Sequence, residues 1–199
     1  RLVFTGTMAL GEAAKRVSVI KSVALKEGQS GPLCFVTVRH TVTGENTGAV
    51  IEEEHDIVYR AKNGARPTAN AHKAQRDGAR SIVPASIDAD QTIHPSPVML
   101  FRYSALTFNG HRIHYDRDYC RDVEGYPGLV FHGPLTATLL ARLACQSHSN
   151  KRLTEFSFRA RAPLFDTEPF TLHLSGANRF AAHTPNGDLA MEAMALFGE

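Results

Sequence analysis

The chain has 199 residues, of which 43% are hydrophobic and 21% charged, a composition typical of a soluble globular protein. Its net charge of +2 makes no demand for a nucleic-acid partner, and its apolar runs are far shorter than the ~20 residues that span a bilayer. Its three cysteines, Cys34, Cys120 and Cys145, form no close pair, so we expect a reducing compartment rather than a disulfide framework. These features predict a cytoplasmic protein, or a mitochondrial-matrix protein in a eukaryote.

Residues 1–60 are predicted to form β-strands. A β-branched run surrounds Val19, and residues 34–39 alternate with the period of two that is typical of a strand. The stretch TGENTG, residues 43–48, predicts a turn between that strand and the next.

Residues 61–92 differ from this β-region in composition. They are rich in Ala, Gly, Asn, Lys and Arg, and they show no apolar period. We interpret the segment as a surface linker. Its basic character also allows contact with a phosphorylated ligand.

The sequence GYPGLVFHGPLTATLLARLACQ, residues 125–146, contains the clearest helix pattern in the chain. We expect Gly133 at the N-cap and Pro134 at the first helical position, where a missing N–H costs nothing. Two adjacent ridges define the apolar face. They consist of Leu135, Leu139 and Leu143, and of Thr136, Leu140 and Ala144.

The remainder of the chain is again predicted to be β-structure. Residues 156–162 alternate in character, residues 170–176 form a second strand, and Asn186-Gly187 favours a type I′ hairpin. Residues 2–23 faintly resemble residues 156–176, which suggests two similar α+β halves.

The stretch FNGHRIHYDRDYC, residues 108–120, is a polar cluster between two apolar runs. His114 is a candidate acid/base, because its ordinary pKa lies near ~6.5. Asn109 can orient a water molecule, and the free N–H of Gly133 at a helix N-terminus can stabilise a developing oxyanion. With no activated Ser or Cys nearby, these groups suit addition or elimination of water beside a carbonyl.

The combined stretch SALTFNGHRIHYDRDYC…EGYPGLVFHGPLTATLLARLA resembles the MaoC-like enoyl-thioester hydratases of the hotdog superfamily. Residues 107–114 occupy the position of the hydratase motif, and residues 131–133 match the family's helix start. The strand-turn-strand after the helix fits as well. Residues 1–60 resemble the strand part of a second, degenerate hotdog. This points to the two-hotdog branch, which includes itaconyl-CoA and mesaconyl-C4-CoA hydratases and 3-hydroxyacyl-thioester dehydratases.

The resemblance implies an α+β double hotdog, in which an antiparallel sheet wraps around a long helix, with the first hotdog incomplete at the N-terminus. The implied organisation is a degenerate hotdog at 1–60, a linker at 61–92 and a catalytic hotdog at 93–199. The implied activity is that of a hydro-lyase. It would hydrate a 2-enoyl-CoA thioester, with itaconyl-CoA or mesaconyl-CoA as examples of a short dicarboxylic substrate, or would dehydrate a 3-hydroxyacyl thioester.

By the same resemblance, His114 and Asn109 are the catalytic residues, although most members have Asp where this chain has Asn109. Gly133 would bind the thioester oxygen. CoA enters as part of the substrate, and no metal or redox cofactor is expected. The expected assembly is a homodimer with no nucleic-acid or membrane partner. Further substrate-binding candidates are Arg102, Tyr103, Ser104, His132, Arg159 and Arg161.

Other readings of these residues remain open from sequence alone. Asn109 and His114 can cap a turn, His132 can make a structural turn hydrogen bond, and the arginines can be solvated. His111, His114 and Cys120 raise the possibility of a zinc site or of a Cys/His nucleophile. At the level of function, the alternatives are a non-catalytic acyl-thioester-binding module and a hotdog thioesterase.

Overall fold

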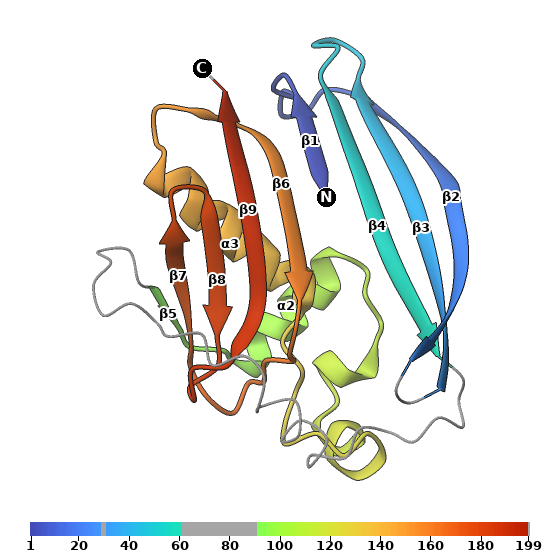
Figure 1. The fold of residues 1–199 in the computed structure, drawn as a ribbon, viewed down its shortest axis with the longest axis vertical. Coiled ribbons are helices and arrows are strands. Elements are labelled where there is room, and N and C mark those ends of the chain that lie inside the picture. Colours follow the sequence, from blue (N-terminus) through green and yellow to red (C-terminus); the bar gives the residue numbers. More distant parts are fainter. Residues whose placement is uncertain (29–30, 61–90, 199) are drawn as a thin grey trace. The chain divides into compact units, whose positions relative to one another are not determined.

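The computed structural model describes residues 1–28, 31–60 and 91–198, and Figure 1 shows the order of their elements. The chain divides into two compact units. Unit 1 holds residues 1–66, 152–157 and 196–199, and unit 2 holds residues 67–151 and 158–195. Residues 61–90 of the predicted linker lie outside the described residues, and residues 91 and 92 already belong to strand β5. The character of residues 61–90 therefore stays a prediction.

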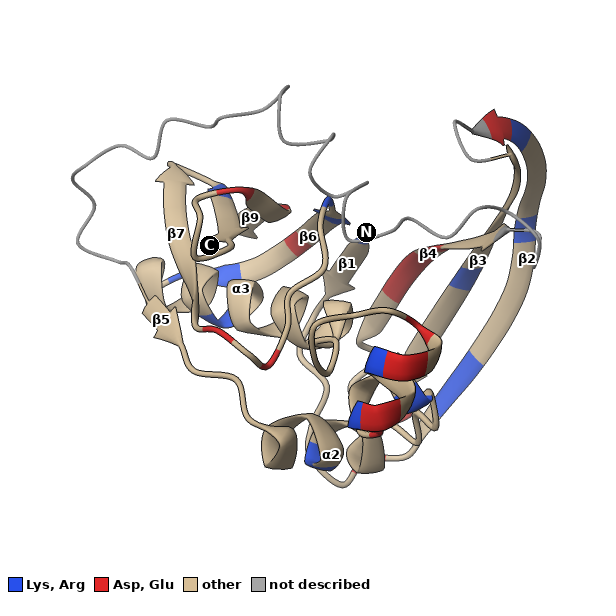
Figure 2. Ribbon diagram, turned by 90° about the horizontal axis from the view of Figure 1, so that it is seen from below, with Lys and Arg blue, Asp and Glu red and all other residues tan. Residues whose placement is uncertain are grey.

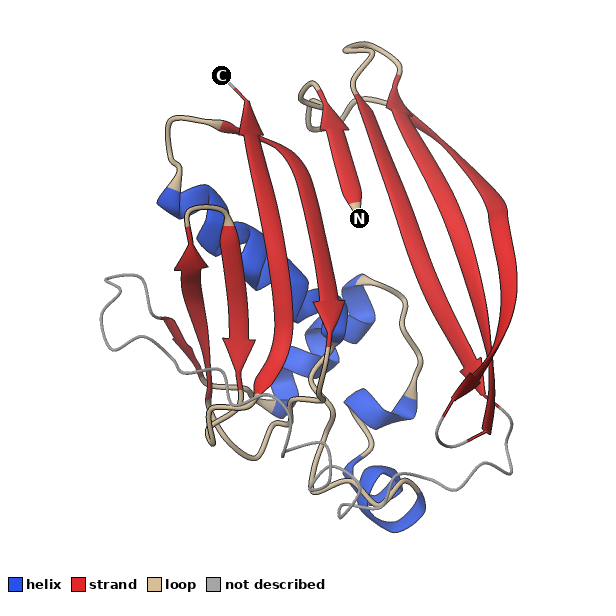
Figure 3. Cartoon of the chain, in the orientation of Figure 1, coloured by secondary structure: helices blue, strands red, loops and turns tan. Residues whose placement is uncertain are grey.

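In the described part of unit 1 every regular element is a strand, as Figure 3 shows for β1 to β4. All pairs are antiparallel, in the order β2-β3-β4-β1, and β1 also pairs with the first half of β6. The strands predicted within residues 1–60, and the turn at residues 43–48, are confirmed. The bounds are β1 Leu2–Thr5, β2 Ala14–Gly28, β3 Gly31–Gly44, β4 Val50–Arg60 and β6 Arg152–Ala160.

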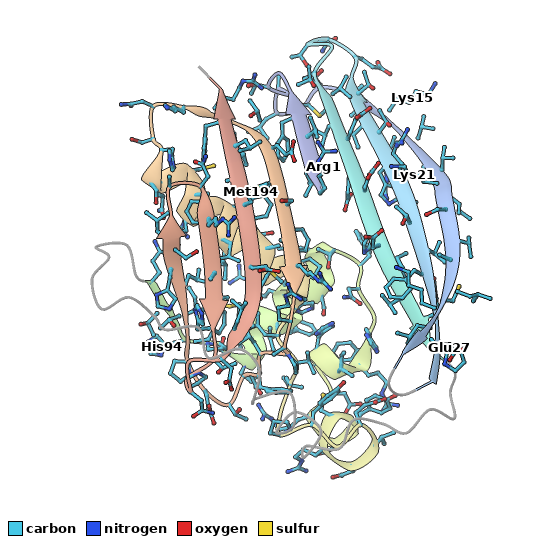
Figure 4. All side chains as sticks on the ribbon, in the orientation of Figure 1. Arg1, Lys15, Lys21, Glu27, His94 and Met194 are labelled. Atoms are coloured by element: carbon cyan, nitrogen blue, oxygen red, sulfur yellow. The ribbon has the colours of Figure 1, made fainter. Side chains whose placement is uncertain are left out.

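The β2-β3-β4 sheet contains both apolar and charged cross-strand neighbours. Val36 of β3 lies between Val23 of β2 and Ile57 of β4. Elsewhere in the same sheet Glu54 of β4 forms ion pairs with Lys21 of β2 and with Arg39 of β3. Figure 2 shows the acidic stretch on β4 and the basic residues on β2 and β3, and Figure 4 labels Lys21 on its strand. Such exposed ion pairs contribute little to the stability of the fold, typically about 0–1 kcal/mol each.

Unit 2 contains the long helix that the sequence predicts, together with the strands that cover it. Helix α3 spans Gly133–Ser147 and contacts β7 and β8. Strand order in this unit is β9-β8-β7-β5, again antiparallel where the pairing is described. The bounds are β5 Gln91–Ile93, β7 Phe170–Gly176, β8 Arg179–His183 and β9 Leu189–Gly198. Of the two predicted ridges of α3, Thr136, Leu140 and Ala144 are fully buried, whereas Leu135 and Leu139 are only partly buried.

The core of unit 2 forms between α3 and one face of the sheet. Leu172 of β7 and Ala182 of β8 are paired neighbours and are both fully buried, as is Leu140 of α3. Phe131, just before α3, packs edge-on against Phe170 of β7 with ring centroids 4.9 Å apart. Burying a side chain of this size stabilises a fold by about 1.5–3 kcal/mol. This core fixes the position of the N-terminus of α3.

The predicted N-cap of α3 is off by one residue. The N-cap is His132, whose backbone is extended, and Gly133 is the first helical residue. Pro134 is therefore the second helical residue and not the first, but it still lies within the first turn, where a proline removes no hydrogen bond that the helix needs.

The structure also contains a helix that the sequence pattern did not predict. Helix α2 spans Pro97–Leu106 and is capped by the Ser96 side chain, which accepts a hydrogen bond from the N–H of Met99 at 3.2 Å. Apolar residues occur on several sides of this helix, so the period of 3.6 is hidden. Two short helical turns follow, η2 at Arg112–His114 and η3 at Tyr119–Val123. None of the helices in the described residues is long and apolar enough to cross a membrane.

The hairpin between β8 and β9 is not the type I′ turn that Asn186-Gly187 favours. Among non-glycine residues of the described chain only Phe108 has a positive φ, so Asn186 does not adopt the left-handed conformation that type I′ requires. The N–H of Gly187 instead bonds the carbonyl of Thr184 at 2.9 Å, and Gly187 itself has φ 82°. Pro185 holds its own φ negative and therefore favours a type I turn with a left-handed glycine after it.

Candidate active site

The predicted catalytic loop begins where α2 ends. The N–H of Asn109 bonds the Ser104 carbonyl at 2.9 Å, and the N–H of Phe108 bonds the Ala105 carbonyl at 3.3 Å. Together these bonds form a Schellman motif, which requires a left-handed residue just after the helix. That residue is Phe108, with φ 53°, although glycine is usual there. Backbone strain of this kind is typical of functional sites.

Asn109 is held by a turn hydrogen bond. Its side-chain Oδ1 accepts from the backbone N–H of His111 at 3.0 Å, which is the capping role that the sequence also allowed. The amide oxygen is therefore engaged in the protein. The amide Nδ2 is the end of the side chain that remains to donate a hydrogen bond to a ligand or a water.

His114 lies in η2 and is buried, with 8% of its surface exposed. Its Nδ1 lies 2.8 Å from the carbonyl oxygen of Val130. Because a carbonyl only accepts, Nδ1 must carry the hydrogen, and Nε2 keeps its lone pair. Burial lowers the pKa of His114, the Val130 hydrogen bond opposes this effect, and the charge of His111 lowers the pKa further. His114 is therefore a neutral base near pH 7.

The Val130 carbonyl that orients His114 is itself fixed by backbone bonds. The N–H of Val130 bonds the Ile113 carbonyl at 2.9 Å, and Val130 also bridges to Phe165. The buried carboxylate of Asp166 accepts from the N–H of Leu129 at 2.8 Å and pairs with Arg117. A methyl group at Gly128 would lie 2.7 Å from that carboxylate, so only glycine fits there without a shift. The segment before α3 is thus held firmly in place.

His132 lies against His114. The two rings stack with centroids 3.7 Å apart and an angle of 17°, and His132 is fully buried. Its Nε2 lies 2.9 Å from the Ser104 hydroxyl, and Tyr103 packs edge-on at 4.8 Å. Its Nδ1 has no hydrogen-bond partner within the described part of the chain. Burial, and next the neighbouring His114, lowers the pKa of His132 to about 4, so this ring is neutral at pH 7.

Gly133 begins α3 immediately after His132. Open space lies in the direction of the missing side chain, because a Cβ built on Gly133 would meet nothing within 4 Å outside its chain neighbours and its own helix backbone. The first N–H groups of a helix lack internal partners and carry the positive end of the helix dipole. Since His132 stacks on His114, this anion-stabilising helix end and the predicted base belong to one local cluster.

The remaining predicted residues lie around this cluster or apart from it. Tyr103, Ser104 and His132, predicted as substrate contacts, are brought together with His114 through the contacts given above. Arg161 is exposed and pairs with Glu192, its Nε 2.9 Å from that carboxylate. The described contacts of His114, His132 and Asn109 include none of the three predicted arginines. The other two, Arg102 and Arg159, are exposed.

The geometry does not support a zinc site at His111, His114 and Cys120, or Cys120 as a nucleophile. His111 is exposed and lies edge-on to His114, with ring centroids 5.7 Å apart. The Cys120 thiol is buried and donates to the Ile113 carbonyl at 2.9 Å, and burial raises its pKa, which disfavours the reactive thiolate. Across residues 1–28, 31–60 and 91–198, no three His, Cys, Asp or Glu side chains converge as a metal site needs.

The stacking of His132 on His114 is the feature that sequence reasoning missed. The sequence points to both residues, but it predicts that His132 contacts the substrate and not the base. The two lie 18 positions apart, and no periodicity relates a 3-10 turn to the residue before a helix. A histidine directly before an apolar helix that starts with Gly-Pro was the available signal.

The site thus combines a neutral base in η2, an amide donor in the loop after α2, and the N-terminus of α3, the helix that the antiparallel sheet covers. Solved structures share the fold. The peroxisomal multifunctional enzyme type 2 from Drosophila melanogaster matches 99% of this chain and 36% of its own, with a TM-score of 0.72 and 13% identity. A Mycobacterium tuberculosis protein described as a double hotdog matches 99% of this chain and 73% of its own, with a TM-score of 0.57 and 16% identity. The predicted α+β double hotdog is confirmed.

The chain belongs to the family of type 2 hydroxyacyl-thioester dehydratases, whose sequence profile matches residues 1–166. It is 42% identical to mesaconyl-C(4)-CoA hydratase from Chloroflexus aurantiacus over 202 residues, which cover all of this chain and 68% of that protein. It is also 39% identical over 83 residues to the mitochondrial type 2 hydroxyacyl-thioester dehydratase of Schizosaccharomyces pombe, covering 41% of this chain and 28% of that protein. The family resemblance, and with it the prediction of a hydro-lyase, is confirmed.

Proposed function

We propose that the chain catalyses reversible addition of water to a 2-enoyl-CoA thioester. One observation carries this proposal: the Nδ1 of His114 is bound to the Val130 carbonyl at 2.8 Å, which leaves a basic Nε2 beside the N-terminus of α3. A neutral base and an anion-stabilising helix end are the two groups that a water addition next to a carbonyl requires.

In the proposed reaction the thioester carbonyl accepts a hydrogen bond from the N–H of Gly133. This polarises the double bond and makes the β-carbon electrophilic. Water, held by the Nδ2 of Asn109, adds its oxygen to the β-carbon while the Nε2 of His114 takes its proton. The resulting enolate oxygen is stabilised by the helix N-terminus. The α-carbon then takes a proton from His114, which restores the neutral imidazole.

Asn109 gives this mechanism a specific constraint. An amide neither accepts nor releases a proton at neutral pH, so among the two predicted catalytic residues only His114 can transfer one. The same imidazole would then take the proton from water and deliver it to the α-carbon. Both additions would occur on the face of the double bond that His114 covers.

The mesaconyl-C(4)-CoA hydratase that shares 42% identity motivates the choice of substrate, a short dicarboxylic enoyl-CoA. CoA would be part of the substrate, and water addition of this kind calls for no metal or redox cofactor. We further propose that the protein works as a homodimer without a nucleic-acid or membrane partner. Sedimentation velocity at several concentrations tests the assembly.

The direct test is hydration of mesaconyl-C4-CoA, itaconyl-CoA and crotonyl-CoA, followed by loss of the enoyl-thioester absorbance band. We expect turnover of the dicarboxylic substrates to exceed that of crotonyl-CoA. Release of free thiol without hydration would identify a thioesterase instead. Saturable binding without turnover of any of the three would identify a non-catalytic binding module.

The change Asn109→Asp tests the role of the amide. A carboxylate keeps an oxygen that can accept from the His111 N–H, but it loses the Nδ2 donor. If the donor holds the water or the substrate, we expect kcat to fall about 100- to 1000-fold, as for loss of one preorganised donor. Equal or higher kcat on crotonyl-CoA would show that the Nδ2 donor is not required.

A further inference from the structure

We propose that Ser104 and His132 are positioning residues, which hold the imidazole of His114 in a fixed plane and keep it free of a charged neighbour. For its kinetic part this inference rests on the proposed function. It assigns a role to two residues that the sequence suggested as substrate contacts.

Three contacts around His114 define the arrangement. The Val130 carbonyl binds its Nδ1 edge at 2.8 Å, and the ring of His132 covers one face at a centroid distance of 3.7 Å. The hydrogen bond fixes the direction of the ring edge, and the stacked ring opposes rotation about that edge. Together they determine where Nε2 points.

Ser104 ties this stack to the rest of the predicted site. Its hydroxyl lies 2.9 Å from Nε2 of His132, and its backbone carbonyl accepts the N–H of Asn109 at 2.9 Å. One residue of α2 therefore contacts both the ring that supports the base and the backbone of the second predicted catalytic residue. A shift of Ser104 would move both groups together.

Accessibility separates this role from substrate binding. His132 is fully buried, whereas His114, the proposed base, keeps 8% of its surface exposed and Asn109 is partly exposed. A side chain with no accessible surface offers nothing to a ligand, but it can pack against a neighbour that does. The Nδ1 of His132 lacks a partner in the described residues, so nothing in them supplies an acceptor that would stabilise an imidazolium there.

The charge state of His132 matters because two stacked imidazoles repel when both are protonated. The groups that face the pair are Tyr103 from α2, His111 before η2 and the Val130 carbonyl before α3. Burial keeps His132 neutral, with its pKa lowered to about 4, so His114 can take a proton from water without a charged ring above it.

Three variants test the arrangement kinetically: Ser104→Ala, His132→Phe and the double variant. Phenylalanine keeps a flat ring of similar size but cannot bond Ser104. We expect each single change to lower kcat about 10- to 100-fold, since a misplacement of about 1 Å at a catalytic group has effects of this size. KM should change less than about threefold, and the double variant should be no slower than the slower single variant, because both changes remove one contact.

Matched controls are available at the C-terminal end of α3. Ser147 donates to the Leu143 carbonyl at 2.9 Å, and His148 lies 3.2 Å from the Ala144 carbonyl near the helix C-terminus. Ser147→Ala and His148→Phe should keep kcat within twofold of the wild-type value. If Ser104→Ala and His132→Phe fold normally and keep kcat, or raise KM alone, the positioning role is wrong.

A second measurement does not depend on turnover. Nitrogen-15 NMR of histidine-labelled protein reports the tautomer and titration midpoint of His114. In the wild type we expect a hydrogen on Nδ1 and a midpoint below the ordinary value of about 6.5. In His132→Ala, water can reach the ring, so the midpoint should rise toward that value and the tautomers should mix. An unchanged midpoint and tautomer would overturn the inference, even if the wild-type chain hydrated none of the thioesters.

Discussion

Units 1 and 2 present long antiparallel strands, yet they bury apolar side chains to very different degrees. In unit 1 the β2 side chains Ile20, Val23 and Leu25 are 66%, 61% and 79% exposed. In unit 2, Leu172 of β7 is fully buried and Phe180 of β8 is 1% exposed. The strands are similar in kind, so the difference lies in what packs against them. Within the described residues, only the sheet of unit 2 packs against a long helix.

The comparison shows that one helix serves two purposes. Leu140 and Ala144 of α3 complete the core, and the start of the same helix supplies Gly133 and the stacked His132. Firm packing of the helix body holds its N-terminus still, which an oriented donor requires. Unit 1 has strands without such an element in its described residues, and no predicted catalytic residue falls within it.

The largest expected effect on kcat comes from replacing a histidine of unit 2, and a histidine of unit 1 serves as its control. Removal of the proposed base in His114→Ala should lower kcat for enoyl-CoA hydration about 10²- to 10⁴-fold, the usual contribution of general acid–base catalysis. His40 of β3, which lies 2.7 Å from the Ser18 hydroxyl, provides the matched control in unit 1. His40→Ala should keep kcat within twofold. Unchanged turnover in His114→Ala would contradict the mechanism.

Core substitutions test whether the helix really makes the difference in packing. Leu140→Ala removes a fully buried side chain and should lower the free energy of unfolding by about 2–5 kcal/mol. Val23→Ala removes a largely exposed one and should cost less than about 1 kcal/mol. Urea denaturation followed by circular dichroism measures both changes. Similar decreases in the free energy of unfolding at the two positions would mean that the Val23 side chain is as fully buried in solution as that of Leu140.

Acid should weaken unit 2 through its buried histidine. The folded state holds the pKa of His132 at about 4, whereas the unfolded chain has the ordinary value of 6.5. Below pH 6.5 the unfolded state therefore binds more protons, and stability falls until the pH reaches about 4. From pH 7 to pH 5 this one group should cost about 2 kcal/mol. The wild-type protein should lose that much more than His132→Phe in urea titrations at the two pH values; an equal loss would place His132 in a less buried environment.

The smallest effect concerns the strained residue at the end of α2. Phe108 has φ 53° and is 97% exposed, so Phe108→Gly relieves strain without removing a buried contact. We expect a gain in stability of about 0.5–1 kcal/mol, because glycine adopts this conformation readily but loses more entropy on folding. Thermal melting measures the gain. A loss of stability would indicate that the aromatic ring makes a contact in solution that offsets its strain.

Several elements were predictable because their signals are local. The strands before residue 60 and the helix after His132 followed from periodicity and turn residues. The motif also singles out Asn109 and His114, whose catalytic role stays a prediction. Helix α2 was missed because apolar residues on several of its sides conceal the period of 3.6. The type I′ turn was wrong because Pro185 imposes a negative φ just before Asn186. These errors come from competing local preferences, which a single pattern does not weigh.

The sequence by itself determined the family, the hotdog architecture and the residue types that the proposed chemistry needs, since these depend on motifs and on short-range periodicity. Only the tertiary structure decided how those residues are arranged. It placed His132 on the face of His114, gave the Nδ1 hydrogen of His114 to the Val130 carbonyl, and used the Asn109 oxygen in a turn. Such contacts join positions that no sequence spacing relates, because the packing of α2, η2 and α3 brings them together.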